Sequence, residues 1–407
     1  MKENNQTKKI QSVSIILAGI IWAFWILKKG VKFSPDSGSY SYLGDLLIKY
    51  DFNYFNFLAN TEDVAPIALY SAWVSIVAIS KVILSDKWGV GIVVINYIAA
   101  IYILVLTLKI TNLVNRNFVS IIFASLALIC CYEFFMWTHY VLSDILFAAI
   151  SFSIIFLSIS LFQEPTRPQK RIASGLILFA IALFFRPASP PLVVFIFLAI
   201  LFGFFFKLGS SDENKRNRLI FGLTLFSCIA IISVLFFHSH IMLEPENWPF
   251  SFFKTWIAIL ANDYKLGVVV FDRPETFLSI PTNIFDYLFI TLCKFISFFS
   301  ITFNGYSKIH SFFNYLFFAP IYLLSLFSIV LLYKKHSGLS TIKWWTIFLC
   351  FIYIVLFAFF HSLNQIDYDL RYRVPCLPPL VLLATIGFNE LMTRFFKKAS
   401  NKEMHLL

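Results

Sequence analysis

Long apolar runs recur along the chain and restrict its fold more than any other feature of the sequence. Many reach roughly 18 residues or more, which as a helix is enough to cross about 30 Å of hydrocarbon. The chain is 59% hydrophobic and only 14% charged, whereas water-soluble domains carry more charge. Its mean hydropathy is +0.78. The sequence therefore predicts an all-α, polytopic membrane protein.

The apolar runs give a first estimate of the topology. Those predicted to span the membrane lie at about 10–27, 89–108, 118–136, 141–162, 172–185, 190–207, 219–237, 315–332, 344–361 and 378–396. Two further apolar stretches, 65–84 and 283–303, are ambiguous. The first span follows the N-terminus without a small-residue cleavage site, so we expect it to be retained.

The net charge of +11 gives the orientation. Basic residues cluster in the termini and in short loops between spans, as the positive-inside rule requires, and not in a groove for nucleic acid. The loops and termini predicted to be cytoplasmic carry Lys2, Lys8, Lys9, Lys109, Arg116, Arg167, Lys170, Arg171, Lys207, Lys215, Arg216, Arg218, Lys334, Lys335, Lys343, Arg394, Lys397 and Lys398.

These loops all lie on one side only if neither ambiguous stretch crosses the membrane. We therefore expect 65–84 and 283–303 to lie along the outer interface or to re-enter. The count becomes about ten spans in one domain, residues 1–407, with both termini cytoplasmic. Two large outer loops remain, 28–88 and 238–314. Lys28, Lys29 and Lys32, at the start of the first outer loop, are exceptions to the rule.

The first outer loop contains the sequence PDSGSY. Asp36, on a turn at the membrane rim, could accept a proton from an acceptor hydroxyl. It could equally be the N-cap of a short helix along the membrane, since Tyr40, Leu43 and Leu46 follow helical spacing. Tyr40 is a candidate substrate contact.

The second outer turn, WTHYVLSDILF, places Asp144 near the start of a span. There the helix dipole would favour its negative charge, which is a structural explanation. The functional alternative is a second catalytic carboxylate that faces the same cavity as Asp36. His139 is a candidate substrate contact, with an interfacial structural role as the alternative.

Arginines mark two further outer turns. Arg186, in LFFRPASPPL, could extend to lipid head groups or bind a lipid phosphate bidentately. Arg371 and Arg373 flank Tyr372 in DLRYRVP, and predict a site for a lipid-linked phosphate. An anchoring belt of Arg and Tyr is the alternative, although the nearby Asp369 favours a paired network. Tyr372 and Asp369 are thus candidate substrate contacts.

The order of these segments resembles the GT-C superfamily of polyprenyl-phosphate-sugar-dependent glycosyltransferases. PDSGSY, SDILF, the Pro-flanked Arg186 turn and DLRYRVPCLPPLVLLATIG carry the resemblance, which is nearest to the protein O-mannosyltransferases and the lipid A aminoarabinose transferases. Many relatives have a second acidic residue beside the first, where this chain has Ser37.

The resemblance implies a sugar transfer at the outer face of the plasma (inner) membrane, from a polyprenyl-phosphate donor to a lipid or glycan acceptor, with inversion. It implies that Asp36 is the catalytic base or aligns the acceptor, that Asp144 shares its site, and that Arg371 or Arg373 contacts the carrier phosphate. The family's interfacial helices resemble 40–50 and 65–84. Carboxylates near a phosphate would suit a divalent metal, but no ligand spacing supports one.

Three other functions compete with this one. A polysaccharide polymerase or ligase would take a lipid-diphosphate oligosaccharide, but it would not need a carboxylate in the first loop. A lipid flippase or small-molecule transporter would show internal repeats and charges near mid-membrane, and no repeat is evident. A structural scaffold would not concentrate ionisable residues at the outer rim, where each is costly unless it is paired or hydrated.

Overall fold

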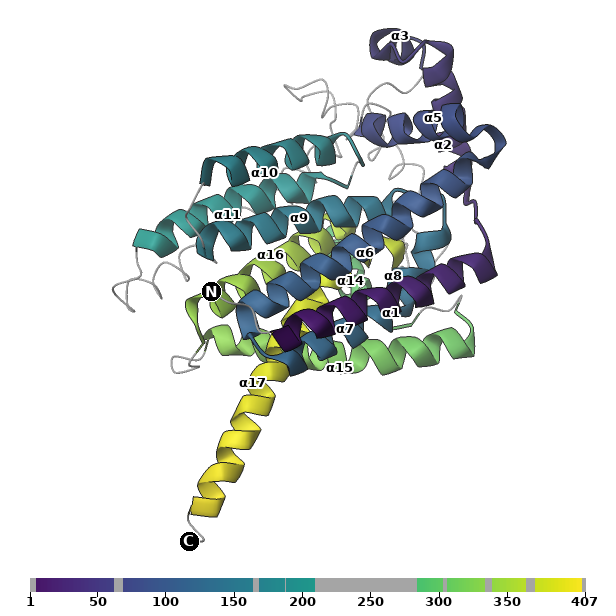
Figure 1. The fold of residues 1–407 in the computed structure, drawn as a ribbon. Coiled ribbons are helices and arrows are strands. Elements are labelled where there is room, and N and C mark those ends of the chain that lie inside the picture. Colours follow the sequence, from purple (N-terminus) through teal and green to yellow (C-terminus); the bar gives the residue numbers. More distant parts are fainter. Residues whose placement is uncertain are drawn as a thin grey trace.

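We describe the 407-residue chain from a computed structural model. The structure describes residues 5–61, 69–163, 168–186, 188–208, 284–302, 306–333, 339–363 and 370–404. Within these ranges the chain is helical, and its only β-type pairing is a single bridge between Lys32 and Tyr140. The predicted all-α class is confirmed for this part of the chain (Figure 1).

The described chain contains the following helices, with 3-10 helices marked η. They are α1 (Asn5–Lys29), α2 (Pro35–Lys49), α3 (Tyr54–Ala59), α5 (Ser71–Leu84), η1 (Ser85–Lys87), α6 (Trp88–Asn115), α7 (Phe118–Ile129), α8 (Tyr132–Met136), η2 (Trp137–His139), α9 (Asp144–Gln163), α10 (Pro168–Leu183), α11 (Pro190–Leu208), α14 (Ile284–Phe298), α15 (Lys308–Tyr333), α16 (Thr341–Leu363), η4 (Leu370–Cys376) and α17 (Leu377–Met404).

Six helical stretches in the described ranges are long and apolar enough to cross a membrane. They are Asn5–Lys29, Ser71–Asn115, Asp144–Leu161, Lys308–Leu332, Thr341–Ser362 and Arg371–Phe395. A seventh results if α7 and the segment Tyr132–His139, bent by 50° at their junction, form one broken span. These helices are those of a multi-pass membrane protein. The count of about ten stays a prediction, and the expected span 219–237 lies outside the described residues.

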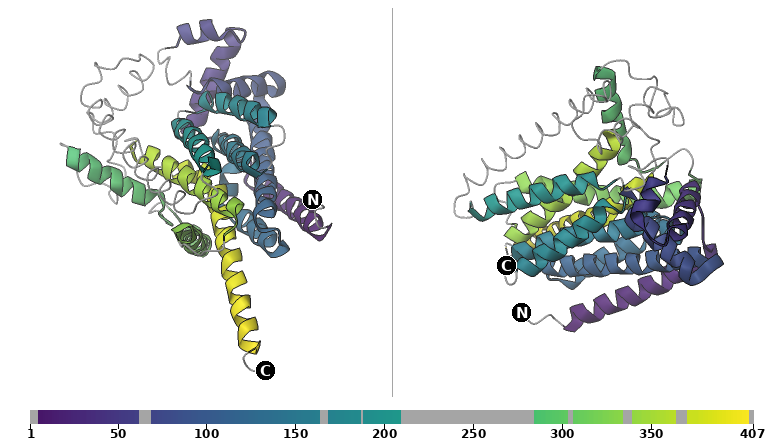
Figure 2. Two further views of the ribbon diagram at one scale, coloured as in Figure 1. Left: turned by 90° about the vertical axis from the view of Figure 1, so that its left-hand side faces the viewer. Right: turned by 90° about the horizontal axis from the view of Figure 1, so that it is seen from above.

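The two ambiguous stretches form short helices. α5 has 14 residues and α14 has 15, so at 1.5 Å per residue each is about 21–23 Å long, less than the roughly 30 Å of a bilayer core. α14 runs crosswise to α9 and α11 in the right-hand view of Figure 2, as a helix lying along a membrane surface would. α5, however, continues through η1 into α6 as one helical run. The interfacial placement of both stretches stays a prediction.

A continuous apolar core holds the bundle together. Its large buried side chains include Trp22, Phe134, Phe147, Phe152, Phe195 and Tyr353. α17 packs against α15 at Gly387, where any Cβ would collide with the backbone carbonyl of Leu324. This close approach fixes α17, and therefore also fixes η4, which directly precedes it.

Candidate functional site

The start of α2 presents Asp36. Ser34 is the N-cap of this helix: its Oγ accepts a hydrogen bond from the backbone N–H of Ser37 at 3.4 Å, and its own N–H donates to Ser37 Oγ at 2.9 Å. This reciprocal capping box, followed by Pro35 at the first helical position, defines the helix start. The expectation that Asp36 itself might be the cap is wrong, because Ser34 occupies that position.

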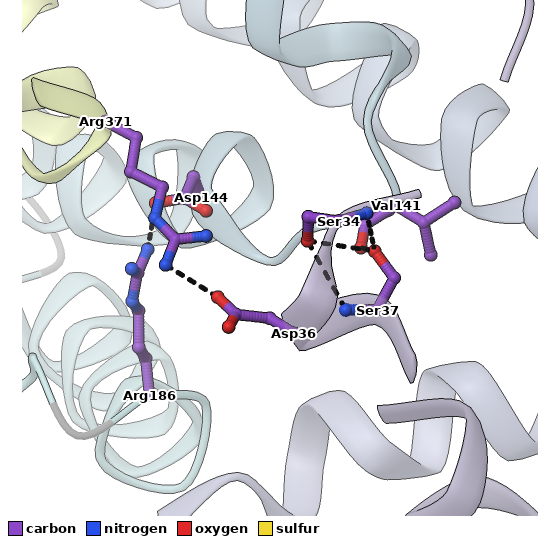
Figure 3. Close-up of polar contacts among 7 residues, drawn as sticks. All are labelled: Ser34, Asp36, Ser37, Val141, Asp144, Arg186 and Arg371. Carbon is purple, nitrogen blue, oxygen red and sulfur yellow. Dashed lines mark hydrogen bonds and ion pairs between the residues drawn. The ribbon is translucent and has the colours of Figure 1, made fainter. Parts of the chain in front are cut away.

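The Asp36 carboxylate instead pairs with Arg371. Its Oδ2 lies 2.6 Å from Nη2 of Arg371, which reaches it from η4 (Figure 3). The Asp36 side chain is 41% exposed and the Arg371 side chain 14% exposed. The pair is therefore accessible from outside through its carboxylate, while the guanidinium is largely enclosed.

A second ion pair joins Asp144 to Arg186. Asp144 is the first residue of α9, and Arg186 lies in the turn between α10 and α11. Their side chains are 2% and 7% exposed, and the carboxylate accepts a hydrogen bond from Arg186 Nη1. Burial, the largest single effect, lowers the pKa of Arg186, but Asp144, Tyr70 and Tyr40 together outweigh it and raise the pKa above its usual range. Arg186 is thus permanently charged.

Backbone contacts bring the two acidic residues together. Ser37 Oγ donates to the carbonyl of Val141 at 2.9 Å, three residues before Asp144 (Figure 3). The Val141 N–H in turn donates to the carbonyl of Lys32 at 2.9 Å. Asn96 Nδ2, on α6, donates to the carbonyls of Tyr140 and Leu142 at 3.0 and 3.1 Å. The first loop and the turn before α9 are therefore held as one unit.

An aromatic ring links the two arginines. The guanidinium carbons of Arg186 and Arg371 lie 5.4 and 5.5 Å from the ring centroid of Tyr372, within the range of a cation–π contact. The same ring stacks on His361 of α16, with centroids 4.6 Å apart and planes 3° apart. Tyr372, expected as a substrate contact, thus lies within the cluster and orients its two cations.

Two tyrosines complete the cluster on the side of α2 and α5. Tyr40 and Tyr70 pack against each other, with ring centroids 5.4 Å apart. Burial raises the pKa of both phenols; the charge of Arg186 opposes this effect, while Asp36 and Asp144 add to it. We call the set Asp36, Asp144, Arg186, Arg371, Tyr372, Tyr40 and Tyr70 the outer cluster. The sequence analysis missed Tyr70, which carries no motif and lies within the ambiguous apolar stretch 65–84.

Arg373 does not join the outer cluster. It forms a bidentate ion pair with Glu133 of α8, with Nε 2.6 Å from Oε2, and both side chains are almost completely buried. The expected joint phosphate site of Arg371 and Arg373 is therefore not supported by their placement, because the two side chains diverge. Glu133 was not among the candidate site residues. Its signal was an acidic residue within an apolar run, which requires a partner.

His139 also lies apart, and Asp369 lies outside the described residues. The Nδ1 atom of His139 accepts a hydrogen bond from Trp25 Nε1 at 3.4 Å, and its ring contacts Trp25 and Tyr140. Its backbone carbonyl accepts from the N–H of Lys32 at 2.9 Å. These contacts correspond to the structural alternative for His139 rather than to a substrate contact.

No cluster suited to a metal ion occurs among the described residues: none has three or more His, Cys, Asp and Glu side chains gathered together. The carboxylates of Asp36 and Asp144 face guanidinium groups instead. The outer cluster can therefore do two things chemically. Its arginines can bind an anion, and its exposed carboxylate can accept a proton.

The comparisons with known proteins assign no family to the chain: no family model, no curated protein and no solved structure matches it.

Proposed function

We propose that the protein is a membrane glycosyltransferase of the GT-C type, which transfers a sugar from a polyprenyl-phosphate donor to an acceptor hydroxyl at the outer face of the plasma (inner) membrane. The observation that carries the proposal is the pairing of Asp36 with Arg371 at 2.6 Å. A carboxylate and a guanidinium, from opposite ends of the chain, are the two groups that this reaction requires side by side.

In the proposed reaction Arg371 binds the donor phosphate. Guanidinium matches phosphate oxygens with two parallel hydrogen bonds, as it does carboxylate oxygens. The Asp36 carboxylate, paired with Arg371, occupies the position that the phosphate would take. A donor phosphate would therefore displace Asp36 from Arg371 and leave its carboxylate available to the acceptor.

The released carboxylate then accepts the proton of the acceptor hydroxyl. The hydroxyl oxygen bonds to the anomeric carbon while the bond from that carbon to the phosphate oxygen breaks, so the configuration inverts and polyprenyl phosphate leaves. Arg371 stabilises the negative charge that grows on the leaving oxygen. Arg186 adds positive potential, although Asp144 already neutralises much of its charge.

The accessibility of Asp36 favours this function over a lipid-diphosphate polymerase or ligase, which needs no carboxylate in the first loop. Asp36 is the exposed member of the outer cluster's two carboxylates, at 41%, whereas Asp144 is enclosed at 2%. This difference supports Asp36 as the base, and supports Asp144 as the residue that holds Arg186.

Asp36→Asn tests the proposal, because asparagine keeps the shape but cannot accept the proton. Transfer from a radiolabelled polyprenyl-phosphate sugar to membrane acceptors should fall by roughly 10²–10⁴-fold, the usual contribution of a general base. Asp45→Asn is a matched control, since Asp45 lies on the same helix and pairs with Lys81 at 2.6 Å. Near-normal transfer by the Asp36 variant would reject this assignment.

A further inference from the structure

We infer that Glu133, acting through Arg373, positions Arg371 against Asp36. This inference rests on the proposed function for its role in catalysis, but its geometric content stands apart from it. Neither Glu133 nor Arg373 touches the outer cluster's carboxylates. Both are therefore positioning residues and not catalytic ones.

The geometry of η4 directs its two arginines to different partners. Arg371 and Arg373 lie two residues apart in this seven-residue 3-10 helix. A 3-10 helix turns by about 120° per residue, so side chains two apart leave the axis in clearly different directions. Arg371 accordingly points toward Asp36 and Arg373 toward Glu133. The direction in which one arginine side chain leaves the helix therefore fixes the direction in which the other leaves it.

The Arg373 guanidinium contacts three separate segments of the chain. Its Nε and Nη2 bind both carboxylate oxygens of Glu133, and its Nη1 donates to the backbone carbonyl of Ser300. Its guanidinium carbon also lies 4.3 Å from the ring centroid of Phe318, on α15. The Arg373 side chain is 3% exposed.

The Glu133 carboxylate has two further hydrogen-bond donors besides Arg373. Its Oε1 accepts from Asn314 Nδ2 at 2.7 Å and from the Tyr306 hydroxyl at 3.3 Å, and its side chain is 1% exposed. The network therefore joins α8, η4, α15 and the segment after α14. Removing one partner of a buried pair leaves an uncompensated charge, so the pair does not open easily.

η4 is therefore held in place at Arg373, two residues after Arg371. The Asp36 side chain, by contrast, is the more exposed member of its ion pair with Arg371. The buried network thus supplies the fixed end of the site. A donor phosphate can exchange with Asp36 on Arg371 while Arg371 stays in place.

A cross-linking experiment tests the geometry without using the reaction. In the full-length protein, Asp36→Cys and Arg371→Cys remove the ion pair itself, so that only the rest of the structure holds the two positions near each other. A short bis-methanethiosulfonate should bridge them rapidly in membranes. Mass spectrometry of the bridged peptide separates this product from bridges to native cysteines.

Three network variants are then compared in this background. Glu133→Gln and Glu133→Asp should each slow bridging by about tenfold, because small displacements strongly reduce the rates of oriented reactions. Glu133→Leu combined with Arg373→Met replaces the pair by apolar side chains, which often preserves stability. This double variant should remain folded in a thermal unfolding assay, yet bridge as slowly as the single variants.

The control is Glu390→Gln, which breaks the 2.6 Å ion pair between Lys343, near the start of α16, and Glu390 of α17, neither of which belongs to the Glu133 network. It should leave bridging unchanged. Unchanged bridging in the folded double variant, or equal slowing by Glu390→Gln, would overturn the inference and leave the Glu133 pair a purely structural contact.

Donor kinetics form the second arm, with Asp36 and Arg371 restored. The folded double variant should raise the KM for the polyprenyl-phosphate sugar by about tenfold while kcat changes less, because Arg371 would be misplaced and not removed. If the unmodified protein transfers no sugar, the proposed function fails. The cross-linking result still decides the positioning role.

Discussion

Arg371 Nη2 lies 2.6 Å from Asp36 Oδ2, so that the 3-10 helix before the last long helix is joined to the first turn of α2. Two residues later in the same short helix, Arg373 is buried against Glu133. The first pair is partly exposed and the second is enclosed. The exposed pair can therefore exchange partners, whereas the enclosed pair cannot.

Substitution of Arg371 should impair use of the donor. Arg371→Ala removes charge-assisted hydrogen bonds worth about 1.5–3 kcal/mol, so the KM for the polyprenyl-phosphate sugar should rise by roughly ten- to a hundredfold. Arg371→Lys, which keeps the charge but loses the planar fork, should lie between. Initial rates over a range of donor concentrations measure both. Arg394→Ala, near the other end of the spanning stretch Arg371–Phe395, is the control, and equal donor saturation in all three variants would remove Arg371 from the donor site.

Loss of Asp144 should destabilise the protein more than loss of an exposed acidic residue. Asp144→Asn leaves the buried charge of Arg186 without its partner, at a cost of about 3–5 kcal/mol. Asp45→Asn breaks a pair whose carboxylate is 66% exposed and should cost about 1 kcal/mol or less. Thermal unfolding in detergent compares the two variants. Equal losses would mean that the Asp144–Arg186 pair contributes no more than a surface pair.

The tyrosines of the outer cluster predict a loss of stability at high pH. Because burial raises the pKa of Tyr40 and Tyr70, the folded protein holds their protons more tightly than the unfolded chain does. Their contribution is complete below the unfolded pKa of about 10 and is lost as the pH rises above it. Tyr40→Phe has no proton to lose, so its unfolding temperature should fall less between about pH 8 and pH 11.

Tyr42→Phe is the matched control for this measurement, since Tyr42 is an exposed tyrosine on the same helix. If Tyr40→Phe and Tyr42→Phe showed the same fall in unfolding temperature, the Tyr40 phenol would not be the group that opposes deprotonation.

Local signals in the sequence predicted a large part of this protein. Apolar runs of spanning length predicted the long helices, because a helix is the local structure that satisfies every backbone group without water. PDSGSY predicted a turn followed by a short helix. The structure has the helix, α2, but it already begins at Pro35, so Asp36 lies in its first turn and not on a preceding turn. Asp36, Asp144, Arg186, Arg371 and Tyr372 were candidates on residue type and place alone, and they lie in one cluster.

The sequence alone could not assign the partners within these groups. Asp36 was a candidate for capping or for chemistry. The two hydrogen bonds between Ser34 and Ser37 assign the cap to Ser34, and the catalytic role of Asp36 stays a prediction. Arg371 and Arg373 looked equivalent because they are two residues apart beside one tyrosine. Which of them meets Asp36 depends on the rotation of η4, and that rotation is set by Glu133 and by the packing of α17 on α15.

The sequence by itself thus determined that the chain is a bundle of long apolar helices, and which few ionisable residues lie at its loops. Hydropathy and residue type act over a few residues, so they can be read without coordinates. Only the tertiary structure decided that Asp36 meets Arg371 and that Glu133 meets Arg373. Ion pairs form between groups within about 4 Å, and such distances between remote segments result from the packing of all the helices together.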